Sequence, residues 1–185
     1  MAEKKETKSK IEDVIPEYLV GEIQKAALEF VAYLKGNKFS PRLSTNNTET
    51  WKVIYKSKCI CTIHFCKPWK WIQEMKENAT WVVEPHLLYF HEYEDLIMSE
   101  GLQKIIWDGI IFCNGCPPSK GGRRDKNRSC IGGQCATVLG KELKGICANV
   151  PLTRVCDPNE TEIGGIKRIL ELEQRAKDKE TKKAK

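Results

Sequence analysis

Five cysteines in the second half of the chain have the spacing of a metal site. They are Cys113, Cys116, Cys130, Cys135 and Cys147, and the first four form the pattern C-x2-C-x13-C-x4-C. Tetrahedral zinc takes four cysteine or histidine ligands, and two close cysteine pairs joined by a loop commonly supply them. The pattern therefore predicts one structural zinc ion bound by Cys113, Cys116, Cys135 and either Cys130 or Cys147.

The same thiolates leave other uses open. An iron-sulfur cluster also takes cysteine ligands, and buried or free thiols need no metal. A redox role for Cys113 and Cys116 would require the first cysteine at the start of a helix, but this pair follows a predicted helix and precedes Pro117 and Pro118. Residues 117–133 are so polar and so rich in glycine that a metal, contributing on the order of 10 kcal/mol, would account best for their folding.

The segment between the cysteine pairs is basic. Residues 120–128 carry five cations and one acidic residue, and Arg123, Arg124 and Arg128 are the side chains that could grip phosphates. The net charge is +6, but this segment and the two ends of the chain carry more than that, so the rest is mildly acidic. A solvated loop is the favoured interpretation, and a nucleic-acid-binding regulator is the alternative function.

Aromatic residues mark a second candidate binding region. Trp69 and Trp71 flank a lysine and could stack on a base or line a small-molecule pocket, although packing against a sheet edge is the simpler expectation. No paired carboxylates, nucleophile elbow, phosphate-binding glycine loop or zinc-protease motif is present. We therefore assign no catalytic residues, and a thiol or metal enzyme is the third candidate.

A second cluster of metal-ligand residue types occurs at Cys59, Cys61, His64 and Cys66. In an uninterrupted strand, Cys59 and Cys61 would face one side while His64 and Cys66 would face the other. One ion could not collect all four, so we expect core cysteines and an exposed histidine here.

Hydrophobic periodicity predicts the elements of the first half. A helix should begin at Pro16 and end at Gly36, because apolar residues recur every three or four positions between them. Residues 40–50 indicate a loop. Two-residue alternation then predicts strands at residues 51–55 and 59–65.

The second half should add a strand and two helices. Residues 80–83 predict a third strand, which should end before Pro85. Ser99 is a suitable N-cap for a helix reaching Ile110, and a last helix should follow Asp157.

These elements predict an α+β fold, with an antiparallel sheet of three to five strands packed by helices and a C-terminal cysteine-rich metal-binding loop. We expect a disordered lead at residues 1–10, one domain at residues 11–175 that includes the cysteine-rich loop 113–147, and a lysine-rich tail at residues 176–185. With no apolar run long enough to span a bilayer and no secretory signal, we expect a cytoplasmic protein without a membrane partner, whose cysteines are thiols or metal ligands.

The hairpin region carries a family resemblance. The segment from Trp51 to Ile63, preceded by Phe30-Val-Ala-Tyr-Leu-Lys, resembles small bacterial proteins that pair such a hairpin with a cysteine cluster. The hairpin itself is similar to YdhG-like domains of the frataxin-like type, in which a Tyr-Lys-Gly-Lys turn joins two strands; Ser57 stands here in place of that glycine. The resemblance covers about a fifth of the chain and implies helices on an antiparallel sheet, with no catalytic residue. The predicted function is therefore a small module that binds a small molecule or a protein partner and is stabilised by zinc.

Overall fold

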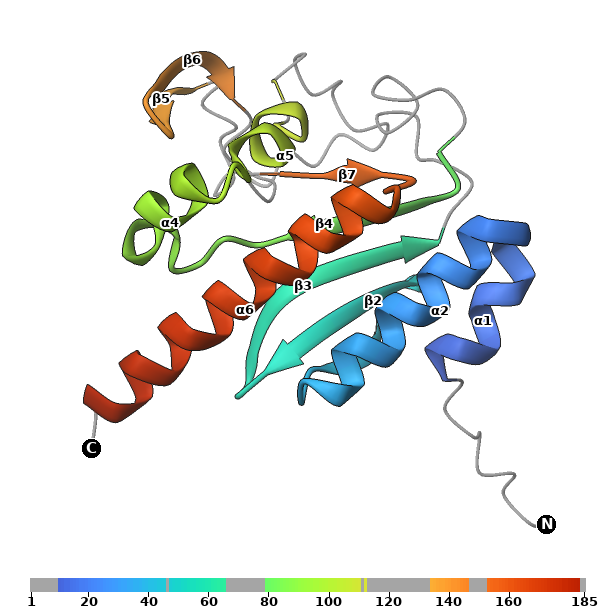
Figure 1. Cartoon of the computed structure of the whole chain (residues 1–185). Helices are drawn as coiled ribbons and strands as arrows, with labels where there is room; N and C mark the ends of the chain where they lie inside the picture. The colour runs from blue at the N-terminus through green and yellow to red at the C-terminus, as the bar shows by residue number, and fades with distance from the viewer. Residues whose placement is uncertain are drawn as a thin grey trace, which may run out of the picture.

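The computed structural model describes residues 10–45, 47–65, 79–110, 112, 134–146 and 153–183. Five strands form an antiparallel sheet in the order β1-β2-β3-β4-β7, and helices α1, α2 and α6 cover one face of it (Figure 1). The strands of this sheet are β1 (Ser40–Ser44), β2 (Asn47–Tyr55), β3 (Lys58–Phe65), β4 (Trp81–Pro85) and β7 (Val155–Cys156). The helices are α1 (Ile11–Tyr18), α2 (Gly21–Gly36), η1 (Phe90–Glu92), α4 (Glu94–Ser99), α5 (Gln103–Asp108) and α6 (Glu160–Lys183).

The predicted α+β class, with helices packed on an antiparallel sheet, is confirmed. Among the described helices none is long and apolar enough to cross a membrane.

Two apolar clusters build the interior, and α6 belongs to both. The larger one packs the sheet against α1, α2 and the start of α6, with Phe30, Trp81 and Ile166 at its centre. The smaller one lies between α4, α5 and the later turns of α6, where Ile97 and Ile106 are fully buried. Because one helix joins both clusters, its burial couples the sheet to the α4–α5 region.

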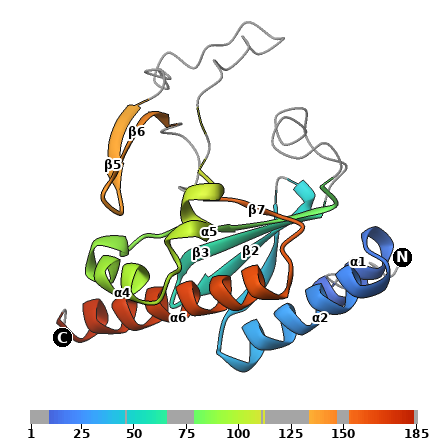
Figure 2. The ribbon, with the colours of Figure 1, turned by 45° about the horizontal axis from the view of Figure 1, so that its top comes forward.

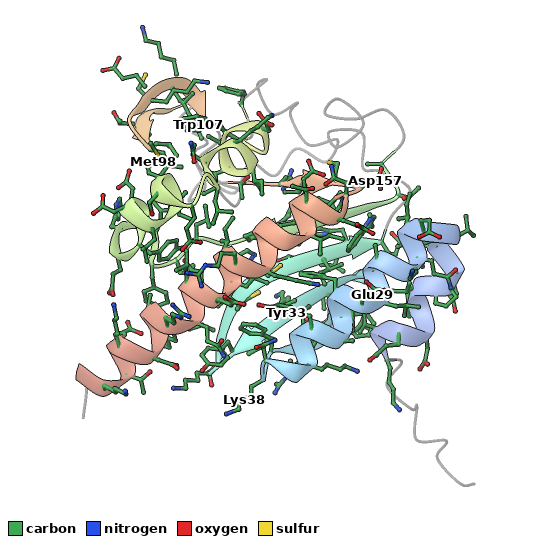
Figure 3. All side chains as sticks on the ribbon, in the orientation of Figure 1. Glu29, Tyr33, Lys38, Met98, Trp107 and Asp157 are labelled. Atoms are coloured by element: carbon green, nitrogen blue, oxygen red, sulfur yellow. The ribbon has the colours of Figure 1, made fainter. Side chains whose placement is uncertain are left out.

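A second, two-stranded sheet packs on the smaller cluster. It is a hairpin of β5 (Gln134–Val138) and β6 (Lys141–Ile146), and Figure 2 shows it above α4 and α5, away from the five-stranded sheet. Trp107, labelled in Figure 3, donates its indole N–H to the Val138 carbonyl at 3.1 Å. The Lys141 ammonium lies 5.4 Å from the centre of the Trp107 ring. These contacts fix the hairpin on α5.

The first predicted helix is divided in two. Pro16 lies inside α1 and does not begin the helix, and the chain is extended at Leu19 and Val20 before α2 starts. Gly21 has φ +62, a conformation that glycine adopts without a Cβ clash. The reversal lets α1 fold back on α2, so that Ile11 and Ile15 enter the larger core.

The predicted helix from Ser99 to Ile110 was also wrong in its boundaries. Ser99 ends α4 and donates its hydroxyl to the Leu96 carbonyl at 3.1 Å, so it does not cap the start of a helix. Gly101 follows with φ +71, the left-handed conformation that commonly terminates helices, and α5 begins at Gln103.

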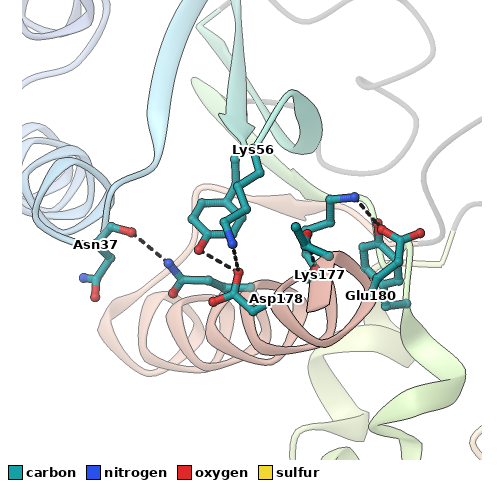
Figure 4. Close-up of polar contacts among 9 residues, drawn as sticks. Asn37, Lys56, Lys177, Asp178 and Glu180 are labelled. Carbon is teal, nitrogen blue, oxygen red and sulfur yellow. Dashed lines mark hydrogen bonds and ion pairs between the residues drawn. The ribbon is translucent and has the colours of Figure 1, made fainter. Parts of the chain in front are cut away.

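Helix α6 continues past residue 175, where we had placed the lysine-rich tail. Ala176 is only 4% exposed. Asp178 accepts a hydrogen bond from the Tyr55 hydroxyl at 2.9 Å and pairs with Lys56 at 2.8 Å, while Gln174 donates to the Asn37 carbonyl at 3.0 Å (Figure 4). The end of α6 is thus attached to the β2–β3 turn and to the end of α2.

The β2–β3 hairpin was predicted, although β2 begins at Asn47, four residues before the expected start, and β1 was missed. Residues 40–44, expected to be part of a loop, form an edge strand that pairs with β2. The turn between β2 and β3 consists of Lys56 and Ser57, with φ +41 and +65. Two positive φ values are what a two-residue type I′ turn requires, and a glycine commonly occupies its second position.

Replacing Ser57 by glycine is therefore expected to raise the free energy of unfolding by about 1 kcal/mol, because glycine has no Cβ to oppose the left-handed conformation. Urea unfolding at neutral pH measures the change. Ser40→Gly, in the extended strand β1, is the matched control and should lower stability, since glycine weakens strands. Equal losses in both variants would contradict this explanation of the turn.

Candidate functional site

One face of the five-stranded sheet is apolar, and the other carries most of its polar side chains beside a small apolar cluster around Val82. Trp51 and Val53 of β2 point toward the helices and are at most 2% exposed. Because side chains alternate along a strand, Thr50 and Lys52 point to the opposite side, which we call the outer face. Polar residues of β3 and β4 share that face, and so does Arg154, which directly precedes β7.

Four of these side chains form a continuous contact chain across the strands, the polar row of Thr50, His64, Glu84 and Arg154. Thr50 lies directly opposite His64, and their Oγ1 and Nδ1 atoms are 3.1 Å apart. His64 Nε2 lies 3.1 Å from Glu84 Oε2. Arg154 donates from Nε to Glu84 Oε1. The two ring nitrogens of His64 thus contact a hydroxyl on one side and a carboxylate on the other.

The polar row is buried although it is charged. Thr50 is 9% exposed, Glu84 3% and Arg154 5%. Burial opposes the Glu84 carboxylate, but contact with His64 and the positive charge of Arg154 outweigh it, so the pKa of Glu84 lies below its usual value. Glu84 is thus held as an anion between two partners.

A second hydroxyl–imidazole pair lies beside the row. Thr62, which pairs with Glu84 across β3 and β4, has its Oγ1 2.8 Å from His86 Nε2. Burial lowers the pKa of His86, and the nearby Glu84 charge opposes that shift only in part. His86 is therefore neutral at physiological pH.

The order hydroxyl, imidazole, carboxylate is that of a relay that activates a nucleophile. Two features favour a positioning role instead. The Thr50 hydroxyl is buried and lines neither of the cavities described below, and Glu84 is committed to Arg154. The arrangement therefore fixes four strands in register and presents a rigid polar floor.

Close backbone contact between α5 and β7 sets the position of Arg154. The Arg154 N–H donates to the Gly109 carbonyl at 2.8 Å. A Cβ on Gly109 would lie 2.1 Å from Thr153 Oγ1 and 2.4 Å from the Arg154 carbonyl oxygen, so only glycine fits. A cavity of about 200 Å³ opens beside this contact, and Asp108 and Glu162 contribute to its lining.

The larger cavity lies at the other end of the outer face, over β1 and β2. We call it the β1–β2 groove; its volume is about 390 Å³. It is lined by two cations, three hydroxyl-bearing residues and two aliphatic residues: Arg42, Lys52, Ser44, Thr45, Ser57, Leu43 and Ile54.

Most of the sequence-predicted site lies outside the described residues. Of the five predicted metal ligands only Cys135 is described, as an exposed residue of β5. Cys113, Cys116, Cys130 and Cys147 lie outside, as do Arg123, Arg124, Arg128, Trp69 and Trp71. Within the described ranges, no group of three or more His, Cys, Asp or Glu side chains is arranged to hold a metal ion. Zinc, iron-sulfur and nucleic-acid binding all stay predictions.

The described residues that border the cysteine-rich segment do come together. Phe112 forms a bridge with Ile146, and Gln134 pairs with the same Ile146. One step further out, Ile110 bridges to Thr153. The two arms of the segment are therefore paired in antiparallel fashion where they leave α5 and approach β7.

Strand alternation did not hold at Cys59 and Cys61. Cys59 pairs with Ile54 and Cys61 with Val53, so Ile60 is an extra residue in a β-bulge. Cys61 is fully buried in the larger core, and Cys59 faces the outer side. Burial raises the pKa of both thiols, so neither is an activated nucleophile.

Comparison with known proteins gives no family model, no curated protein and no solved structure that matches this chain. The resemblance of the hairpin to YdhG-like domains therefore stays a prediction.

Sequence reasoning missed the polar row. The sequence did contain a signal for two of its residues. Thr50 stands in alternation with the apolar Trp51 and Val53, and Glu84 is a charged residue within the apolar strand β4. Arg154 carried no local signal, because its partner Glu84 is 70 residues away.

Glu84→Gln is expected to lower the free energy of unfolding by about 3 kcal/mol at pH 7, because it removes the buried carboxylate that pairs with Arg154. The folded-state pKa of Glu84 is lower than its usual 4.5, so the stabilising charge is complete above pH 4.5 and is lost as the pH falls through the folded-state pKa. Urea unfolding from pH 7 down to pH 3 measures this effect. The difference in free energy of unfolding between wild type and variant should become smaller below pH 4.5.

Glu100→Gln is the matched control. Its carboxylate pairs with Arg168 through two contacts of 2.7 Å at the surface, so the loss should stay below about 1 kcal/mol. If Glu84→Gln lowers the free energy of unfolding by the same amount at pH 3 as at pH 7, the charge of Glu84 is not the cause of the lost stability.

Proposed function

We propose that the protein is a binding module for a small molecule, and that a structural zinc ion orders its cysteine-rich segment. The ligands would be Cys113, Cys116, Cys135 and either Cys130 or Cys147. An iron-sulfur cluster on the same thiolates is the alternative cofactor.

The pairing of Phe112 and Gln134 with Ile146 is the observation that carries the metal proposal. In the chain, Cys113 directly follows Phe112, Cys135 directly follows Gln134 and Cys147 directly follows Ile146. Consecutive Cα atoms are about 3.8 Å apart, and the described neighbours of three of the five cysteines are paired with one another. Shared metal binding needs such convergence, because the ligand sulfurs must lie about 2.3 Å from one ion.

The outer face supports the binding half of the proposal. The same face of the sheet carries the polar row and a groove of about 390 Å³, a volume within the usual range of small-molecule sites. Binding requires no chemistry from the polar row, which keeps the floor fixed.

Elemental analysis of the purified protein should find about one zinc ion per chain. Cys135→Ser should lose most of it, because the variant keeps only three thiolate ligands, and chelation of the wild-type protein should lower its melting temperature. Cys59→Ser, on the outer face of the other sheet, is the control and should keep its zinc.

Iron with visible absorption would identify the cluster alternative. A protein without metal, in which the five candidate ligand thiols titrate rapidly and chelators leave the melting temperature unchanged, would overturn the cofactor proposal.

A further inference from the structure

The β1–β2 groove contains two cations placed directly opposite each other. Arg42 of β1 is the register partner of Lys52 of β2, and both side chains are on the outer face. Like charges at directly opposed positions of neighbouring strands repel and destabilise the pair. The fold keeps the two charges together at the edge of the sheet without an obvious structural gain.

Nothing within the described part of the chain neutralises this pair. Neither Arg42 nor Lys52 has an ion-pair partner there, and no carboxylate is among the described residues that line the groove. Arg42 donates only a long hydrogen bond of 3.4 Å from Nε to the Ser40 hydroxyl. Glu84 lies on the same cross-strand line as Arg42 and Lys52, two strands away from Lys52, but it is already paired with Arg154 and His64.

The rest of the groove provides both hydrogen bonds and apolar contact. Ser44, Thr45 and Ser57 bring hydroxyl groups to its wall, and Ile54 brings aliphatic carbon. Cations and hydroxyls together suit carboxylate or phosphate oxygens, and the aliphatic part suits the body of an organic molecule.

Two backbone irregularities give the groove its shape. The register between β1 and β2 shifts between Leu43 and Ser44, where β2 has three extra residues beside the edge strand. The left-handed Ser57 bounds the groove from the β2–β3 turn. Bulges at sheet edges commonly redirect side chains at binding sites, and here both irregularities border the same cavity.

We propose that the β1–β2 groove binds a small organic anion, with its carboxylate or phosphate group between Arg42 and Lys52 and its apolar part against Ile54. The bound anion would replace the repulsion between the two cations by two charge-assisted contacts. This assignment gives the ligand class of the binding module proposed above and rests on that proposal, but it is independent of the zinc ion.

Thermal melting of the full chain with phenyl phosphate, benzoate or inorganic phosphate tests the site, against sodium chloride at equal ionic strength and benzyl alcohol as the uncharged analogue. At least one of the anions should raise the melting temperature saturably, by about 2–4 °C at a few times its Kd, while chloride and benzyl alcohol should not. If phenyl phosphate and inorganic phosphate act equally, the anionic group alone is recognised, which overturns the apolar part of the proposal.

Arg42→Gln and Lys52→Gln should each abolish the shift, while the unliganded variants should melt at the wild-type temperature or above it because the repulsion is removed. Lys25→Gln is the matched control: it removes an exposed lysine from α2, on the other side of the sheet, and should keep the full shift. A shift that persists in Lys52→Gln, or no saturable shift with any of the three anions in the wild type, overturns the assignment.

Zinc content measured in the same samples separates the two proposals. Anion binding by a protein that contains no metal would support the groove proposal and overturn the zinc proposal. A zinc-loaded protein without anion binding would do the reverse.

Discussion

A buried carboxylate needs a counter-charge, and Glu84 finds it 70 residues further along the chain in Arg154. Both side chains are at most 5% exposed, so losing either partner would leave a charge in a medium that solvates it poorly. The pair joins β4 to the start of β7 and forces the chain that leaves the sheet after β4 to return beside it. The placement of α5, the approach of the cysteine-rich segment and the start of α6 all depend on that return.

Helix α6, which follows β7, packs on both apolar clusters and so joins the sheet and the α4–α5 region. An Asn159–Glu162 capping box, with hydrogen bonds of 2.9 and 3.0 Å, starts the helix directly after β7. Its first turns complete the larger core and its later turns the smaller one, where Glu173 accepts a hydrogen bond from the Tyr89 N–H at 3.0 Å. Beyond Ala176 the helix also contacts the β2–β3 turn through Asp178, so the turn that bounds the groove is held by the same helix.

The two faces of the five-stranded sheet have different roles. The helix-covered face supplies stability through apolar burial, as the contact between Phe30 and Trp81 illustrates. The outer face carries buried polar groups that contact one another, as Thr62 contacts His86, and such contacts offset the cost of burying them. Such a face has a defined shape and charge before any ligand arrives, which reduces the ordering cost of binding. The proposed anion site lies where this face ends in Arg42 and Lys52, which repel each other.

The sequence by itself determined what local periodicity and spacing can encode: the α+β class, the β2–β3 hairpin, the last helix and the cysteine pattern that predicts a metal. Only the tertiary structure decided the break at Gly21, the bulge at Ile60 and the edge strand β1, because each depends on what the backbone packs against. The polar row and the Arg42–Lys52 pair are also features that only the tertiary structure decides. Their residues are ordinary where they stand in the sequence, and strand register, a long-range property set by the burial of the opposite face, brings them together.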